Sequence, residues 1–252
     1  MTPDTSLTVP ARFCGPPGMG NGGYVSGRLA GCLDGPVPGT AVEVTLRRPT
    51  PLDRRLDIVR QGTKAILLEG DSVLAEASPA TMDEWHPDRA TFNEAAGAAT
   101  LPVIPHARHP LPHCFVCGPE RKAGDGLCIH PGRLGGPTSA VLAAPWIPDA
   151  GLGDRDGRVL PEFIWAALDC PGGFAVVADD QAESVLLGRL AVRIVDRPAV
   201  GETCSITARR LGRDGRKLRA GSALYGATGD LLAVAMATWI SVPPEALRAG
   251  AA

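Results

Sequence analysis

The sequence predicts an α+β protein built from two copies of one unit, each an antiparallel sheet wrapped around a central helix. A short apolar helix is expected over residues 160–173, and strand-like alternation broken by turn signals follows it from 185 to 242. The same order, a helix, a strand, a Pro-containing turn and three strands in hairpins, occurs between residues 22 and 78. A repeat of this length indicates a duplicated module whose copies pack as the subunits of a dimer would.

Length and composition fit a globular protein of one large or two small domains. The chain has 252 residues, of which 44% are hydrophobic and 21% charged. Its net charge of −2 gives no indication of a nucleic-acid partner. No apolar stretch reaches the roughly 20 residues that cross a bilayer, and residues 1–10 have neither a basic start nor an apolar signal core. We therefore expect a cytoplasmic protein with no membrane partner.

The first copy is predicted over residues 1–83. It begins with an edge strand at Ser6–Phe13, which Pro10 interrupts. A glycine-rich loop then leads to Asn21, a good N-cap for a helix over Gly22–Leu33. The strands expected after this helix are Ala41–Arg48, Leu52–Arg60, Lys64–Glu69 and Ser72–Ser78.

One face of this first helix carries no side chains, because Gly23, Gly27 and Gly31 follow one another at spacings of four. Such a face allows close approach of another group. Either the helix packs tightly on the sheet, or a ligand lies near the exposed amides at its start.

Residues 84–112 are predicted to join the two copies, because they are rich in Pro and His and show only a weak helical patch near Phe92–Ala99. The second copy is expected over residues 113–252. Its strands are predicted at Leu127–Leu134, Ser139–Trp146, Leu187–Val195, Thr203–Leu211, Lys217–Tyr225 and Leu231–Val242.

The central helix of the second copy contains an unusual carboxylate. Pro161 suits the first helical position, and Pro171 with two glycines after it predicts the helix end. Glu162, Trp165 and Asp169 share one face, which places the two carboxylates roughly 10 Å apart. An acidic residue late in an apolar helix needs a reason: Asp169 meets water, caps a neighbouring loop, or faces a substrate cleft.

Four segments carry the pattern of a known family: Leu168–Gly173, Asp196–Gly201, Gly229–Ala233 and Cys114–Glu120. The first three resemble segments of hotdog-fold acyl-CoA thioesterases, and Cys114–Glu120 looks like the lead-in to the first strand in that family. The first copy is similar to the N-terminal half of double-hotdog acyl-CoA thioesterases through Asn21-Gly22-Gly23-Tyr24 and the strands after it. The resemblance implies two tandem hotdog modules that act on acyl-CoA or another acyl thioester without a cofactor.

The resemblance also implies a composite site. In many hotdog thioesterases an Asn-Gly-Gly or His-Gly-Gly helix opening supplies amides that polarise the carbonyl. An acidic residue about nine positions into the partner's helix is then the base or nucleophile. Asn21-Gly22-Gly23 matches the opening and Asp169 the acidic position. The converse positions are Pro161, which has no amide hydrogen, and Ala30, which cannot act as a base. One site is thus expected to be active and its pseudo-symmetric counterpart inactive.

Five further residues are expected to bind substrate around this site. Glu162, Trp165 and Tyr24 lie on or beside the two helices. Arg209 and Arg210 belong to an arginine-rich hairpin that either holds the phosphates of CoA or forms a solvated face.

The same residues leave one alternative to hydrolysis open and disfavour two others. The departure from the helix-opening pattern at Pro161 leaves open a protein that binds acyl-CoA without cleaving it, and a homodimer of such chains also stays open. Hydration of an enoyl-CoA is disfavoured, because none of the five histidines lies in either predicted helix. A dinucleotide site at Gly18–Gly23 is disfavoured as well, since hairpins follow it instead of a crossover helix.

The cysteines give no strong motif. Seven scattered cysteines do not form a recognisable disulfide framework. Cys114 and Cys117, with His113 beside them and Cys128 or His130 later, have the residue types of a zinc site. A lone CxxC pair is more often a tight turn with buried thiols, so we assign no metal site from the sequence.

Overall fold

The computed structural model describes residues 6–33, 40–82, 85, 87–180 and 183–248. The N-terminal part contributes β1 (Ser6–Thr8), β2 (Ala41–Leu46), β3 (Arg55–Gln61), β4 (Lys64–Glu69) and β5 (Ser72–Ala80). The C-terminal part contributes β6 (Gly132–Arg133), β7 (Val141–Trp146), β8 (Ser184–Ile194), β9 (Cys204–Asp214), β10 (Lys217–Tyr225) and β11 (Leu231–Val242). The helices are α1 (Gly22–Ala30), α2 (Phe92–Ala99) and α3 (Pro161–Val177), with short 3₁₀ turns at Ala11–Phe13, His106–Arg108, Ala150–Leu152 and Pro244–Arg248.

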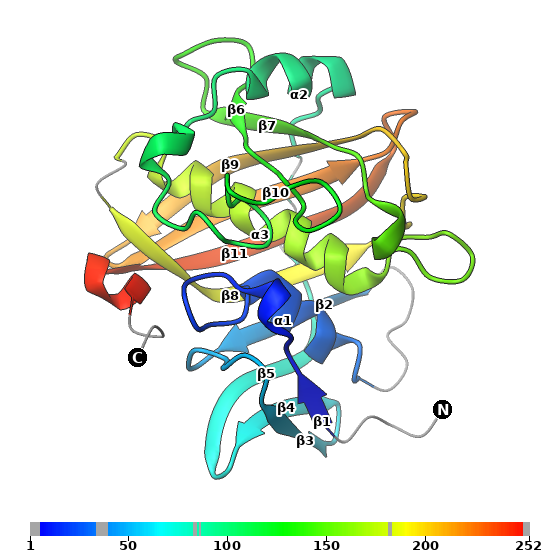
Figure 1. Ribbon diagram of the computed structural model, residues 1–252, viewed down its shortest axis with the longest axis vertical. Helices are drawn as coiled ribbons and strands as arrows, with labels where there is room; N and C mark the ends of the chain where they lie inside the picture. The colour runs from blue at the N-terminus through cyan, green and yellow to red at the C-terminus, as the bar shows by residue number, and fades with distance from the viewer. Residues whose placement is uncertain (1–5, 34–39, 83–84, 86, 181–182, 249–252) are drawn as a thin grey trace.

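These strands form one antiparallel sheet in the order β1-β3-β4-β5-β2-β8-β11-β10-β9-β7-β6. The two parts of the chain meet at its centre, where β2 pairs with β8 in a register that sets Val44 opposite Leu190. Outward from this seam the order mirrors itself, because β2, β5, β4 and β3 correspond to β8, β11, β10 and β9. In Figure 1 the blue and cyan strands occupy the lower half of the sheet and the yellow to red strands the upper half.

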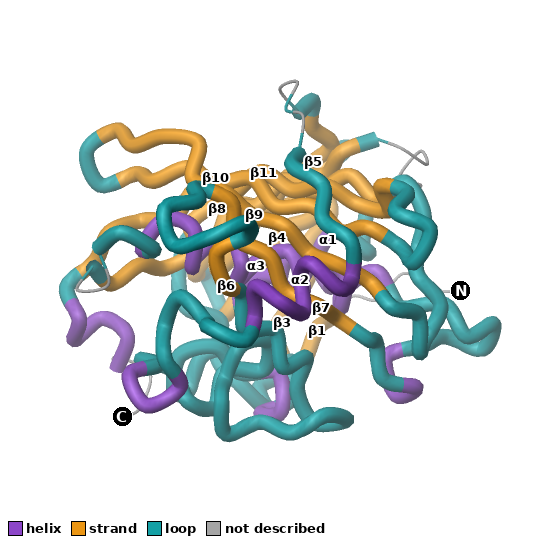
Figure 2. The backbone as a smooth tube through the Cα atoms, turned by 90° about the horizontal axis from the view of Figure 1, so that it is seen from above, coloured by secondary structure: helices purple, strands orange, loops and turns teal. Residues whose placement is uncertain are grey.

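Helices α1 and α3 lie against the same face of the sheet and pack on each other (Figure 1). The view from above in Figure 2 shows that many of the loops gather on this side as well. Helix α3 is buried from Phe163 to Val177 and contacts β8, β9, β10 and β11. No helix among the described residues combines the length and the apolar character needed to span a membrane.

The glycine face of α1 packs against α3, not against the sheet. A Cβ atom at Gly23 would lie 2.5 Å from Cβ of Asp169, and one at Gly27 would lie 2.6 Å from Cα of Glu162. Gly31 has no comparably close neighbour, since the nearest atom to a Cβ there would be 3.5 Å away. The first two glycines therefore let the helix backbones touch, and they bring the start of α1 to the middle of α3.

Substituting Gly23 by Ala is expected to destabilise the protein by about 1–3 kcal/mol, because the new methyl group overlaps backbone and Cβ atoms of α3 that cannot move independently. Chemical denaturation measures this change in the free energy of unfolding. Gly31→Ala on the same helix is the control and should stay within about 0.5 kcal/mol of the parent protein. Equal stability of the two variants would contradict the close helix contact.

Helix α3 continues past the predicted stop at Pro171. Proline inside a helix removes one hydrogen bond and costs about 3 kcal/mol. The last turns nevertheless form, because Phe174 and Val176 are buried, at about 1.5–3 kcal/mol for each fully buried side chain. Gly173 fits under an indole, since a Cβ there would lie 2.8 Å from the Trp239 ring. Tertiary burial thus overrides the local stop signal.

The predicted strand at Leu127–Leu134 is mostly absent, and only Gly132 and Arg133 pair in the sheet, as β6. Leu127 and Ile129 are buried as their alternation suggested, but their amides donate to the carbonyls of Phe115 and Val116. The segment therefore pairs with the turn that follows Cys114 instead of with a strand.

Other predicted boundaries shift by a few residues. The first predicted strand, Ser6–Phe13, divides at Pro10 into β1 and a 3₁₀ turn. Helix α1 ends at Ala30, three residues before its predicted end. The strands β4, β10 and β11 and the helix α2 have the predicted bounds. The boundary between the first copy and the joining segment, at residues 83 and 84, lies outside the described residues.

The start of the joining segment, residues 87–91, covers the face of the sheet away from α3, whereas His109 near its end contacts Phe174 of α3. Hydroxyl groups of Ser205 and Thr207 on β9 donate to the carbonyls of Ala90 and Asp88. Helix α2 packs beside β7, where Thr91 and Glu94 form its capping box. This segment is therefore a structural layer in addition to a link.

Candidate functional site

Asp169 on α3 lies at the N-terminus of α1 and is only 2% exposed. Its Oδ2 accepts hydrogen bonds from the Gly23 amide at 2.8 Å and from Nδ2 of Asn21 at 3.2 Å. Its other oxygen, Oδ1, is buried and has no hydrogen-bond partner in the described structure. Half of this carboxyl group is thus held by the first helix, while the other half is unsatisfied.

Asn21 organises the start of α1. Its Oδ1 accepts from the amide of Tyr24 at 2.9 Å, which is the N-cap bond that the sequence predicted. The same side chain turns Nδ2 toward Asp169. Of the first three helix amides, those of Gly23 and Tyr24 are therefore occupied, and no acceptor for the Gly22 amide is found within the described part of the chain.

Burial raises the pKa of Asp169 from 3.8 to about 7. The cause is desolvation of the charged form, and the hydrogen bonds from Gly23 and Asn21 oppose it. The positive end of the α1 dipole also favours the carboxylate. Near neutral pH the group is consequently poised to take up or release a proton, as a general base must be.

A cavity of about 280 Å³ opens beside this carboxyl group. Asn21, Gly22 and Asp169 contribute to its wall, together with Arg47 and Arg48 from the turn after β2. Residues from both parts of the chain therefore surround one space, and two of them are cationic.

A second cavity of about 340 Å³ adjoins the first, because both are lined by Leu111, Cys170, Val185 and Trp239. Its other walls are largely apolar and include Phe174 of α3. Trp239 has a buried Nε1 atom without a hydrogen-bond partner among the described residues. Trp239 was not predictable as a cavity residue, because strand alternation alone cannot distinguish a core indole from one that lines a cavity.

Three predicted substrate-binding residues serve in packing. Tyr24 is 2% exposed and stacks on Phe13 at a ring-centroid distance of 4.1 Å. Trp165 is buried under Gly27, and Glu162 lies 3.9 Å from the Arg28 guanidinium. The predicted shared face of α3 therefore exists, but it faces α1, and of its members only Asp169 lines the cavity.

The two predicted phosphate-binding arginines lie on β9, away from this cavity. Arg209 pairs with Asp88 at 3.3 Å on the face covered by the joining segment, and Arg210 is exposed. Neither contributes to the wall around Asp169, which instead has Arg47 and Arg48. Arg47 forms an ion pair with Glu76 at 2.6 Å, whereas Arg48 has an exposed side chain.

The inactive counterpart of the site would lie at the other end of α1 and α3. The described residues there provide neither an Asn-Gly-Gly opening nor an acidic residue at the ninth position. Pro161 begins α3 without an amide hydrogen, and Ala30 occupies the end of α1. This end of the pair has the contact between Arg28 and Glu162 in place of a carboxylate held by amides.

The CxxC pair acquires a third cysteine in the structure. Cys170, the residue after Asp169, has its sulfur 3.8 Å from that of Cys114, and Cys117 completes the group. Cys128 and His130, which the sequence offered as partners, are not members of it. Cys170 was not predictable as a third member, because its proximity depends on how α3 packs against a loop that is 56 residues away at Cys114.

Comparisons with known proteins identify the fold. No protein family model matches the chain, and no curated protein matches it in sequence. Solved structures that are similar include the tesB protein of Mycobacterium avium subsp. paratuberculosis, with a TM-score of 0.61, 14% identity and coverage of 96% of this chain and 95% of that one. An acyl-CoA thioesterase II, TesB2, from Mycobacterium marinum has a TM-score of 0.61 and 14% identity over 96% of this chain and 93% of its own. A conserved protein with the hot dog fold from Alicyclobacillus acidocaldarius has a TM-score of 0.57 and 13% identity, covering 95% of this chain and 93% of its own. The chain thus has a hotdog fold.

Proposed function

We propose that this protein is an acyl-CoA thioesterase with a single composite site between two tandem hotdog modules. The modules are residues 1–83 and 113–252, joined by 84–112. The mirrored strand order about the β2–β8 seam supports this division. The observation that carries the function is the buried Asp169 carboxyl group, whose Oδ2 is held by the start of α1 and whose Oδ1 is unsatisfied beside a cavity.

Hydrolysis at this site requires the carboxylate form of Asp169. In the water route, Oδ1 of Asp169 takes a proton from a water molecule while the oxygen of that water attacks the thioester carbon. The C–S bond then breaks, and the thiolate of CoA recovers that proton. The products are the carboxylic acid and the free thiol. In the direct route the carboxylate attacks the thioester carbon, the C–S bond breaks, and the thiolate of CoA leaves a mixed anhydride behind. Water then cleaves the anhydride to the carboxylic acid and the Asp169 carboxylate, and the proton that water releases goes to the thiolate.

The oxyanion formed in either route needs hydrogen-bond donors. Gly22 lines the cavity, and its amide belongs to the first turn of α1, where the helix dipole favours negative charge. The Gly23 amide, which the sequence also offered for this role, donates to Asp169. We therefore assign carbonyl polarisation to Gly22 and carboxylate positioning to Gly23 and Asn21.

The two cavities suit the two ends of an acyl-CoA. The apolar cavity beside Phe174 accommodates the acyl group, and the cavity lined by Arg47 and Arg48 admits the pantetheine arm. Arg47 and Arg48 at the cavity beside Asp169 match the phosphates of CoA. These two arginines replace Arg209 and Arg210 in the proposal, because they lie on the cavity wall.

Replacing Arg48 by Ala is expected to raise KM for acyl-CoA about fivefold at low salt, with little change in kcat, since one exposed charge–phosphate contact is worth about 1 kcal/mol. The effect should shrink as ionic strength rises. Steady-state kinetics at two salt concentrations measure both changes. Arg210→Ala is the matched control on β9 and should leave KM unaltered; an equal effect of both substitutions would contradict the assignment.

Release of free thiol from short, medium, long and aromatic acyl-CoAs tests the function itself. Turnover of at least one class supports hydrolysis. Tight binding of acyl-CoA with no release of thiol by any class would instead support a non-catalytic acyl-CoA-binding protein and would refute the enzyme.

A cytoplasmic location is part of the proposal. No disulfide joins Cys14, Cys114, Cys117, Cys128, Cys170 or Cys204 in the structure. This is the state expected in a reducing compartment.

A further inference from the structure

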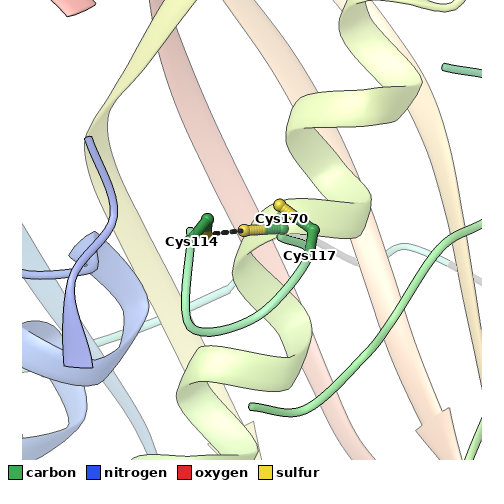
Figure 3. A group of neighbouring side chains, drawn as sticks. All are labelled: Cys114, Cys117 and Cys170. Carbon is green, nitrogen blue, oxygen red and sulfur yellow. Dashed lines mark hydrogen bonds between the residues drawn. The ribbon is translucent and has the colours of Figure 1, made fainter. Parts of the chain in front are cut away.

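Three buried thiol groups converge between the two cavities. Cys114 and Cys117 lie at the ends of a tight turn, and Cys170 reaches them from α3 (Figure 3). Their sulfur atoms all lie within 4.8 Å of one another, and each of the three residues is buried. Among the described His, Cys, Asp and Glu residues, no other group of three or more brings its ligand atoms together in this way.

The backbone directs the first two sulfurs to the same side. The amide of Gly118 donates to the carbonyl of Cys114 at 2.8 Å, which closes the turn. A Cβ atom at Gly118 would lie 2.5 Å from the Pro112 carbonyl oxygen, so only glycine fits there.

The separation of the Cys114 and Cys170 sulfurs matches that of two thiolates on one tetrahedral metal ion. Zinc binds thiolates at about 2.3 Å, so two sulfurs on one tetrahedral zinc lie about 3.8 Å apart. The Cys114 and Cys170 sulfurs are 3.8 Å apart. Nδ2 of Asn21 lies 3.9 Å from the Cys170 sulfur, where it adds the second-shell donor that metal-bound thiolates commonly receive.

We propose that Cys114, Cys117 and Cys170 form a binding site for a thiophilic divalent cation of the zinc class. Three thiolates leave the fourth position of a tetrahedron to a ligand from outside the chain. Cys114 and Cys170 line the cavity beside Asp169, and Cys117 and Cys170 line the apolar cavity. Water or a small thiol entering from either cavity completes the coordination. The ion ties the turn at Cys114–Gly118 to α3 next to Asp169. This site does not depend on whether the protein hydrolyses thioesters.

Metal content is the first test. Protein made without an affinity tag, in medium supplemented with zinc, should contain about one zinc ion per chain, as measured by inductively coupled plasma mass spectrometry. Cys117→Ser and Cys170→Ser should each lower this content at least tenfold. Cys128→Ser is the matched control, since Cys128 is a neighbouring cysteine outside the group, and it should retain the metal.

Binding of cobalt(II) provides a second measurement, which does not depend on enzymatic activity. Apoprotein prepared with a chelator should gain the intense visible absorption of tetrahedral cobalt and a sulfur-to-cobalt charge-transfer band at one equivalent. Zinc should displace that spectrum and raise Tm by about 5 °C or more. In case a serine variant fails to fold, the titration of wild-type apoprotein alone decides the question.

Two results would overturn the site. One is wild-type protein with all three thiols reduced that takes up neither zinc nor cobalt, which makes the group a set of buried apolar thiols. The other is an intact Cys114–Cys170 disulfide in freshly purified protein, found by mass spectrometry after alkylation. Asp169→Asn should keep one zinc per chain, so loss of hydrolysis and loss of metal are distinguishable.

Discussion

Asp169→Asn is expected to lower kcat/KM for acyl-CoA hydrolysis by a factor of about 10³, within the range of about 10²–10⁴ for loss of a general base. The amide has nearly the shape of the carboxyl group and still accepts a hydrogen bond from the Gly23 amide, so the helix contact survives. It cannot take a proton from water or attack a carbonyl. Thiol release under substrate-limited conditions measures the change.

Glu162→Gln is the matched control for this prediction. Glu162 is the other carboxylate on the same face of α3, but it does not line the cavity. Its replacement should leave kcat/KM within about twofold of the parent value. Unchanged hydrolysis in Asp169→Asn, or equal losses in both variants, would remove Asp169 from the chemistry.

The second large effect concerns stability and its dependence on pH. Asp169 has a pKa of about 7 in the folded protein against 3.8 for an ordinary aspartate. Between these values the folded state binds more protons than the unfolded state, so the free energy of unfolding falls as pH rises. From pH 5 to pH 8 the wild-type protein should lose about 3 kcal/mol through this one group.

The Asp169→Asn variant has no ionisable side chain at this position. The free energy of unfolding of the variant, relative to that of the wild type, should therefore increase by about 3 kcal/mol from pH 5 to pH 8. Denaturation at several pH values measures the difference, and this measurement does not require that either protein be enzymatically active. A difference that stays constant across this range would mean that the carboxyl group is not destabilised by burial.

A carboxyl group whose pKa is raised by burial, with one oxygen unsatisfied beside a cavity, is typical of a functional site. A buried carboxylate with an unsatisfied oxygen costs stability, and it stands beside Leu168 and Ala167, which are apolar and fully buried. Such a group is retained where activity needs it.

Much of the fold follows from periodicity and turn chemistry. The two central helices, most strands and the N-cap at Asn21 were predictable, since each depends on residues close in sequence. The encounter of Asp169 with the Asn21-Gly22-Gly23 turn was also expected, on the resemblance to double-hotdog thioesterases.

Features set by tertiary packing were not predictable. Helix α3 passes through Pro171 because the turns beyond it are buried, and the Leu127–Leu134 segment pairs with a turn rather than with a strand. The glycine face of α1 meets a helix, which leaves Tyr24 and Trp165 in the core. No local pattern shows that Arg48, rather than Arg209, reaches the cavity.

In the proposed site, residues of the first half of the chain set the chemistry of a carboxyl group in the second half. The decisive experiment is the pH dependence of kcat/KM in the wild type and in Asn21→Ser. Serine can still cap α1, but its side chain is too short to replace the hydrogen bond from Nδ2 of Asn21 to Oδ2 of Asp169. We expect activity to rise with pH through an inflection near 7, and Asn21→Ser to move that inflection to higher pH. An activity that is independent of pH between about 5 and 9, or an inflection that Asn21→Ser leaves in place, would contradict the account.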